Sequence, residues 1–195
     1  MGAQGKLKMQ WENLVAAYNS GDTDIDIIGF SRGAAMTLEF ANMIADGIPK
    51  NDGSGEKCYP DIRFIGLFDA VGSFGKPGNY INPGIRLTLP QNIKIARVSH
   101  AIAMDEVRDL FPVTDVNTDL PPIPDGGNRA NQVGFTGAHS DIGGGYGGPD
   151  LNDPEHGLSN IALNWMIQQA NSIPGEEALF RELSATCRRQ LVSSP

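Results

Sequence analysis

Hydrophobic and polar residues recur along the chain with two periods, one helical and one extended. Apolar residues spaced three and four positions apart predict helices over residues 7–19, 32–46, 103–111, 158–171 and 176–192. Short β-branched and aromatic runs between turn formers predict strands over residues 24–30, 62–68, 93–98 and 132–136. Glycine, proline and aspartate make irregular loops of residues 47–60, 70–92 and 137–157. Strands that alternate with helices favour an α/β fold, a parallel sheet with flanking helices.

Residues capable of catalysis follow the predicted strands. Ser31 follows the first strand, Asp69 the second, His100 the third and His139 the fourth. Ligands of open parallel sheets bind beyond the carboxyl ends of the strands. We therefore expect the chemistry of this protein at that edge of the sheet.

The first of these positions carries a recognisable pattern. Residues 29–33 read Gly-Phe-Ser-Arg-Gly, which matches G-x-S-x-G between a predicted strand and a predicted helix. That context is typical of a nucleophile elbow, a strained turn that exposes the serine hydroxyl. Gly29 and Gly33 are expected because a side chain there would clash where strand and helix cross. The helix N-terminus favours developing negative charge, and the backbone N–H of Arg32 is a candidate oxyanion donor. A glycine-rich turn without catalysis is the other interpretation.

A serine nucleophile needs a base, and the base needs a group that orients it. In α/β hydrolases these residues follow the order serine, acid, histidine along the chain. Ser31, Asp69 and His139 satisfy that order, and each lies at the end of a predicted strand. They are the predicted catalytic residues. The mechanism needs neither a cofactor nor a metal ion.

Two further residues are alternatives for the same roles. His100 is the rival base, although polar residues around Asp105 favour a structural role for it. Asp141 is the rival acid, but only two residues separate it from His139, so their side chains approach each other awkwardly. His156 lies in a polar loop and is expected to be solvated. The nearby carboxylates of residues 150–155 lack the spacing of a calcium-binding loop.

Composition narrows the class of protein. The chain has 195 residues and a formal net charge of −8, which fits one domain and argues against nucleic-acid binding, since that needs a basic face. No apolar run approaches the roughly 18 residues of a membrane span, and the N-terminus has no apolar signal-peptide core. We therefore expect synthesis in the cytoplasm. Cys58 and Cys187 fall in no metal-ligand spacing, and two free thiols are favoured over one disulfide between them.

Four motifs together resemble a known family. They are residues 29–34, 66–72, 100–108 and 137–146, in that order. The set is similar to an uncharacterised α/β-hydrolase-like family that includes type VI secretion phospholipase effectors. The resemblance implies a Ser-Asp-His lipase or esterase site carried by Ser31, Asp69 and His139. It also implies hydrolysis of phospholipid or smaller esters, a secretion route independent of a signal peptide, and antibacterial toxicity in secreted members.

The chain departs from that family before the elbow. About two dozen residues precede the first predicted strand, where the family places several strands and the loop that supplies a second oxyanion donor. Residues 1–195 therefore resemble the C-terminal half of the fold, as a single partial domain. Residues 24–30 become an exposed edge strand, which we expect to pair with a second chain or to be covered by residues 7–19. A non-catalytic interaction or assembly module on this scaffold is the alternative function.

Overall fold

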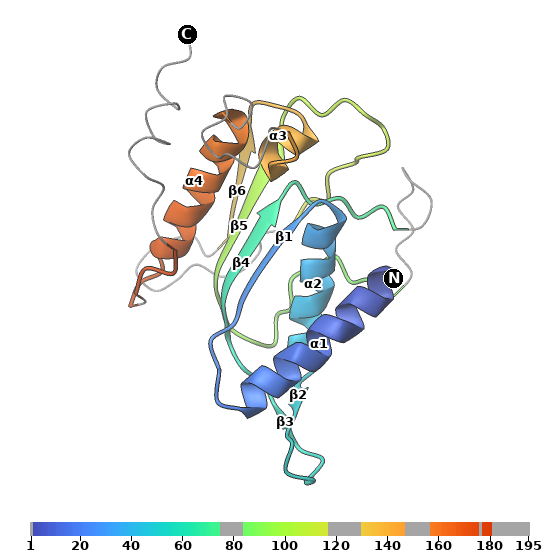
Figure 1. Ribbon diagram of the computed structural model, residues 1–195, viewed down its shortest axis with the longest axis vertical. Coiled ribbons are helices and arrows are strands. Elements are labelled where there is room, and N and C mark those ends of the chain that lie inside the picture. The colour runs from blue at the N-terminus through green and yellow to red at the C-terminus, as the bar shows by residue number, and fades with distance from the viewer. Residues whose placement is uncertain (1, 75–83, 117–129, 147–156, 176, 181–195) are drawn as a thin grey trace.

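The computed structural model describes residues 2–74, 84–116, 130–146, 157–175 and 177–180 (Figure 1). Helices and strands alternate through these residues. The helices are α1 (Ala3–Asn19), α2 (Arg32–Ala45), α3 (His139–Gly143) and α4 (Gly157–Asn171). The strands are β1 (Asp26–Phe30), β2 (Ile48–Pro49), β3 (Lys57–Cys58), β4 (Ile62–Phe68), β5 (Ile95–Ala103) and β6 (Ala130–Phe135).

Four of the strands form one parallel sheet in the order β1-β4-β5-β6. Helices α1 and α2 lie on one side of this sheet and α3 and α4 on the other (Figure 1). Ile65 and Leu67 of β4 pack in the cluster that includes α2, whereas Phe64 packs in the cluster with α3 and α4. A parallel sheet covered on both faces needs strands that are apolar on both faces, which explains the nearly continuous apolar run of β4. The predicted α/β fold is confirmed.

One predicted helix is wrong. Strand β5 continues to Ala103, so His100 lies inside the strand instead of after it. Residues 104–112 then turn across the end of the sheet without forming a helix. The reason is long-range: Asp105 and Glu106 accept hydrogen bonds from the backbone N–H groups of Gly137 and His139. These carboxylates therefore bond to the loop that leads into α3. The sequence pattern instead placed them in the first turn of a helix.

Smaller differences lie in the loops. Residues 47–60 contain the antiparallel pair β2 and β3, and the glycine-rich segment 137–157 contains the short helix α3. The described start of the predicted helix 176–192, residues 177–180, is not helical. The remainder of that helix, Cys187, His156 and residues 150–155 lie outside the described residues. Cys58 is a free thiol.

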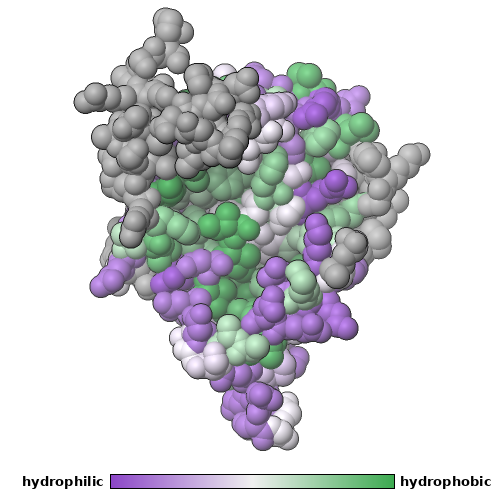
Figure 2. Space-filling model, in the orientation of Figure 1, coloured by the Kyte–Doolittle hydropathy of each residue, from purple (hydrophilic) through white to green (hydrophobic). Residues whose placement is uncertain are grey.

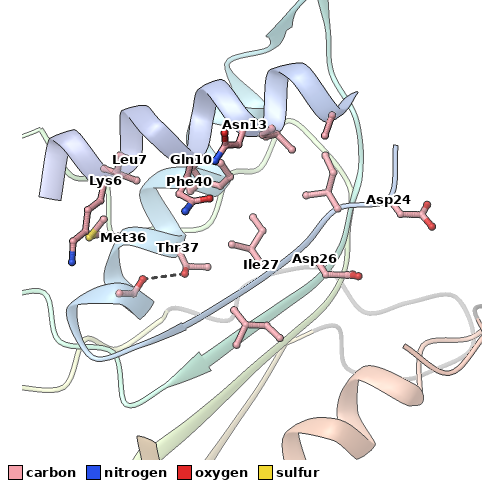
Figure 3. Close-up of a pocket in the computed structure, with 15 residues that line it drawn as sticks. Lys6, Leu7, Gln10, Asn13, Asp24, Asp26, Ile27, Met36, Thr37 and Phe40 are labelled. Atoms are coloured by element: carbon pink, nitrogen blue, oxygen red, sulfur yellow. Dashed lines mark hydrogen bonds between the residues drawn. The ribbon is translucent and has the colours of Figure 1, made fainter. Parts of the chain in front are cut away.

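Strand β1 lies at an edge of the sheet. It pairs with β4 alone, and no strand of the described residues lies on its other side. Helix α1 packs on α2 through the rings of Trp11 and Phe40, whose centroids lie 6.2 Å apart, and a groove of about 570 Å³ remains between α1, α2 and β1 (Figure 3). Ile28 of β1 is 47% exposed. A band of hydrophobic side chains runs over this part of the molecule (Figure 2). The predicted edge strand is therefore present, and α1 covers it only in part.

Candidate active site

Ser31 stands in the turn between β1 and α2 with φ 59° and ψ −130°. A serine in the left-handed region is strained, and such strain persists only where the surroundings enforce it. Two backbone hydrogen bonds do so here. The Ser31 N–H donates to the carbonyl of Phe68 at 2.9 Å, and the Val71 N–H donates to the carbonyl of Ser31 at 3.1 Å. The structure thus has the strained strand-to-helix turn that the G-x-S-x-G pattern predicts.

The two glycines of this turn, Gly29 and Gly33, differ in the space that a side chain would have at each position. A Cβ atom on Gly29 would lie 2.6 Å from the carbonyl oxygen of Gly33 and 2.7 Å from the backbone nitrogen of Ala34. A Cβ atom on Gly33 would meet nothing within 4 Å. The steric requirement predicted for both residues therefore holds for Gly29 and is wrong for Gly33. The strand and helix cross closely at one side of the serine only.

Asp69 follows β4 directly, and its side chain is buried. Its backbone is also left-handed, with φ 39°, and its N–H donates to the carbonyl of Ala101 at 2.7 Å. The carboxylate has two partners. Oδ1 accepts from the Ala103 N–H at 2.9 Å, and Oδ2 lies 2.7 Å from Nδ1 of His139. The end of β5 therefore fixes one oxygen while the other is directed at the imidazole.

His139 is the first residue of α3, and its imidazole joins the other two side chains. Nε2 lies 2.7 Å from Oγ of Ser31. The ring is buried and packs against Phe30 and Phe111, whose ring centroids lie 4.5 and 4.9 Å away. With Nδ1–H donated to Asp69, the lone pair on Nε2 accepts from the serine hydroxyl. The structure brings Ser31, His139 and Asp69 into one hydrogen-bonded series.

Glu106 is a residue of this site that the sequence patterns do not single out. Its side chain is only 6% exposed, and Oε2 accepts from the backbone N–H of His139 at 3.2 Å. Nε of Arg108 donates to Oε1 at 2.8 Å, and this ion pair lowers the pKa of Glu106 to about 2. The charged carboxylate therefore fixes the start of α3, where His139 stands. The available signal was an Asp-Glu pair in the first turn of a predicted helix, but nothing local says which loop it reaches.

His100, the rival base, faces other partners. Its Nε2 accepts from the Ala70 N–H at 3.1 Å, and its Nδ1 lies 2.8 Å from Oε1 of Gln132. Accepting at Nε2 requires the neutral ring, with the proton on Nδ1. Burial agrees, because it lowers the pKa of His100 below its ordinary value. The ring fixes the peptide that follows Asp69 and has no hydrogen bond to Ser31.

Asp141, the rival acid, closes the first turn of α3. Its Oδ2 accepts from the backbone N–H of Ala138 at 2.8 Å, which satisfies a free donor at the helix start. That carboxylate is therefore occupied with the helix terminus, and Asp69 is the carboxylate that bonds to His139.

The backbone around Ser31 offers a donor for negative charge. Arg32 is the first residue of α2, so its N–H has no carbonyl acceptor within that helix. The positive end of the helix dipole is directed at the same position. Within the described residues, no group of three or more His, Cys, Asp or Glu side chains is arranged to hold a metal ion. No helix in the same part of the chain is long and apolar enough to cross a bilayer.

The parallel sheet and the strained serine turn define an α/β-hydrolase-like protein. Residues 49–169 match the family described as the catalytic domain of Tle1-like T6SS phospholipase effectors. The match covers more than half of the chain, which therefore belongs to this family, as the four motifs suggested. The matched residues include Asp69 and His139 and begin after Ser31.

Two solved structures are similar to the chain. An uncharacterised protein from Pseudomonas aeruginosa is 25% identical with a TM-score of 0.55, over 96% of this chain and 30% of that one. The Tle1 effector, solved bound to the VgrG spike of the type 6 secretion system, is 27% identical with a TM-score of 0.50, over 72% of this chain and 30% of its own. The chain thus matches less than a third of either relative. No curated protein matches it.

Proposed function

We propose that this chain carries the catalytic residues of a serine hydrolase for carboxylic esters, phospholipids among them, with Ser31 as nucleophile. One observation carries the proposal. The Ser31 hydroxyl, the His139 imidazole and the Asp69 carboxylate are joined by two contacts of 2.7 Å at the carboxyl end of the sheet. Such a series is the arrangement that activates a serine, which is a weak nucleophile on its own.

In the proposed reaction Oγ of Ser31 attacks the ester carbonyl carbon while Nε2 of His139 takes the hydroxyl proton. The tetrahedral intermediate collapses as His139 returns that proton to the leaving alcohol, which leaves an acyl-serine. Water then attacks the acyl carbon as Nε2 of His139 takes its proton, and His139 passes that proton to Oγ of Ser31 as the acyl bond breaks and the carboxylic acid departs. Asp69 holds the Nδ1–H tautomer and stabilises the imidazolium. The Arg32 N–H donates to the oxyanion, with Gly29 and Gly33 shaping the turn.

The family supports a lipid substrate and a delivery route. Its members are phospholipase effectors of the type VI secretion system. We therefore propose that the protein is a bacterial toxin that is exported without a signal peptide and hydrolyses phospholipids outside the cytoplasm in which it is made. The related Tle1 effector is described bound to a VgrG spike, and an equivalent carrier is a candidate partner here. Since each solved relative is about three times as long as the matched part, we treat residues 1–195 as a single, partial α/β-hydrolase-like domain.

The test is hydrolysis of a short p-nitrophenyl ester by the purified chain, with Ser31→Ala as the variant. Ser54→Ala is a matched control, because that serine lies in an exposed turn between β2 and β3. We expect turnover in the parent and the control and none above background in Ser31→Ala. Equal turnover in all three would remove Ser31 from the mechanism. Absence of turnover in the folded parent would favour the alternative, a non-catalytic interaction module.

A further inference from the structure

Residues 104–113, which follow β5, present their side chains in an unusual order. Two carboxylates bond to the backbone at the start of α3: Oδ2 of the exposed Asp105 accepts from the Gly137 N–H at 2.7 Å, and Oε2 of Glu106, whose side chain is 6% exposed, accepts from the His139 N–H. The neighbouring Val107 is 88% exposed. A segment that faced only water would bury the valine and expose the carboxylate. At Glu106 and Val107 the order is reversed, with the carboxylate buried and the valine exposed.

Other apolar side chains gather on the same segment. Met104 is 69% exposed, Leu110 53% and Val113 46%. Tyr146, which lies near Arg108, is 49% exposed. Hydrophobic side chains appear at the upper end of the molecule in Figure 2, where this segment runs in Figure 1. Single exposed apolar residues are ordinary, but several within one short segment indicate an interaction site. We call these five residues the apolar rim.

The apolar rim adjoins the candidate active site. Phe111, from the same segment, packs its ring on His139 at 4.9 Å, and Arg108 lies over that ring at 4.0 Å. Thr114 then donates its N–H to the carbonyl of Ala70 at 2.7 Å, next to Asp69. The segment is therefore anchored on its inner side to His139 and to the turn that follows Asp69, so its outer side adjoins the candidate active site.

We propose that the apolar rim docks this protein on the surface of a zwitterionic lipid bilayer. This inference rests on the proposed function, because a phospholipid presents its ester at such a surface. Valine, leucine and methionine insert at the boundary of head groups and acyl chains, and tyrosine suits that boundary with its apolar ring and polar hydroxyl. The segment carries three carboxylates, Asp105, Glu106 and Asp109, against one guanidinium. Its charge, like the net −8 of the chain, disfavours anionic lipid.

The experiment measures binding without turnover. Ser31→Ala protein is sedimented with phosphatidylcholine vesicles and, separately, with phosphatidylglycerol vesicles. The test variant adds Val107→Ser and Leu110→Ser. The control variant adds Met9→Ser and Tyr59→Ser, which are 44% and 61% exposed on α1 and after β3, far from the rim. Circular dichroism establishes that each variant is folded.

We expect the parent to sediment with phosphatidylcholine more than with phosphatidylglycerol. The test variant should lose at least fivefold of its phosphatidylcholine binding, and the control variant should keep it. No sedimentation of the parent, equal loss in both variants, or stronger binding to phosphatidylglycerol would each overturn the inference. Because Ser31→Ala cannot turn over, these results are independent of the ester assay. A chain that hydrolyses soluble esters but ignores vesicles loses this inference alone, and one that binds vesicles but hydrolyses nothing loses the proposed function alone.

Discussion

The Val71 backbone N–H donates to the carbonyl oxygen of Ser31 at 3.1 Å, so the turn after β4 is tied directly to the turn after β1. The Ser31 N–H completes the tie by donating to Phe68. Both turns hold a left-handed residue, Ser31 in one and Asp69 in the other. These backbone bonds place the two residues side by side before any side chain takes part. Removing the Ser31 hydroxyl should therefore leave the fold intact, which makes Ser31→Ala a clean test of chemistry.

The glycines on either side of Ser31 should respond in opposite directions to alanine. Gly29→Ala places Cβ against the backbone of Gly33 and Ala34, and we expect it to lower the free energy of unfolding by about 1–3 kcal/mol. Gly33→Ala meets open space inside a helix, and we expect it to raise that free energy by about 0.5–1 kcal/mol. Urea unfolding of the three proteins measures both changes. Similar destabilisation by the two substitutions would contradict the one-sided crossing.

The stability of the protein should depend on pH through His100. Burial lowers the pKa of this imidazole from 6.5 in the folded chain, so below pH 6.5 the unfolded chain binds a proton that the folded chain resists. The free energy of unfolding should therefore fall as the pH drops below 6.5 and gain nothing from this group above it. In His100→Gln, which keeps an acceptor for the Ala70 N–H, that part of the pH dependence should disappear.

His100→Leu tests the hydrogen bond that Nε2 of His100 accepts from the Ala70 N–H. This change leaves the buried Ala70 N–H without its partner, which costs about 1–3 kcal/mol. Because Ala70 follows Asp69, losing this bond should disturb the position of the Asp69 carboxylate. We therefore expect kcat for a soluble ester to fall in His100→Leu while KM stays constant, and kcat in His100→Gln to be closer to that of the parent. Urea unfolding at pH 8, 6.5 and 5.5, with ester kinetics at pH 8, separates the two effects. An identical pH slope in the parent and His100→Gln would show that His100 is not the titrating group.

The sequence predicts the parts of this fold that depend on local pattern. Strand 62–68 is found with those bounds because its apolar run is continuous, and α2 follows its 3.6-residue stripe. The helix predicted after β5 is wrong because the structure of that segment depends on Gly137 and His139, some 30 residues away. The candidate site shows the same division. Ser31, Asp69 and His139 can be predicted because each follows a predicted strand. The roles of Glu106 and His100 depend on long-range contacts, which no local sequence pattern predicts.

The open edge of β1 should have a partner in solution. Ile27 and Ile28 make β1 apolar on both faces like a central strand, yet its outer edge has no strand partner among the described residues. Exposed edges of this kind pair with other chains. Light scattering of the purified chain should therefore give a mass above that of one chain, and Ile28→Lys should reduce it. Met9→Lys, an exposed apolar residue of α1, is the control. A monomer whose β1 amides exchange freely with solvent would oppose this expectation.

The isolated chain should favour small substrates. Losing one oxyanion donor costs on the order of 3 kcal/mol, or roughly 10²–10³ in rate. Arg32 is the one donor that we assign, and a long acyl chain also needs a walled apolar cleft. We therefore expect weak turnover of a short p-nitrophenyl ester and almost none of a long-chain phospholipid, measured side by side with Ser31→Ala as the blank. Fast phospholipid turnover would mean that a second donor and the acyl pocket both come from residues 1–195.

The central claim is that Ser31 is an activated nucleophile, and covalent labelling with a fluorophosphonate tests it most directly. The probe reacts with a serine whose proton a neighbouring base can take, and it needs no acyl pocket. We expect one probe per chain on the peptide that contains Ser31, no labelling of Ser31→Ala, and labelling slowed at least a hundredfold in His139→Ala. A folded parent that stays unlabelled, or a Ser31→Ala variant labelled as fast as the parent, would contradict the claim.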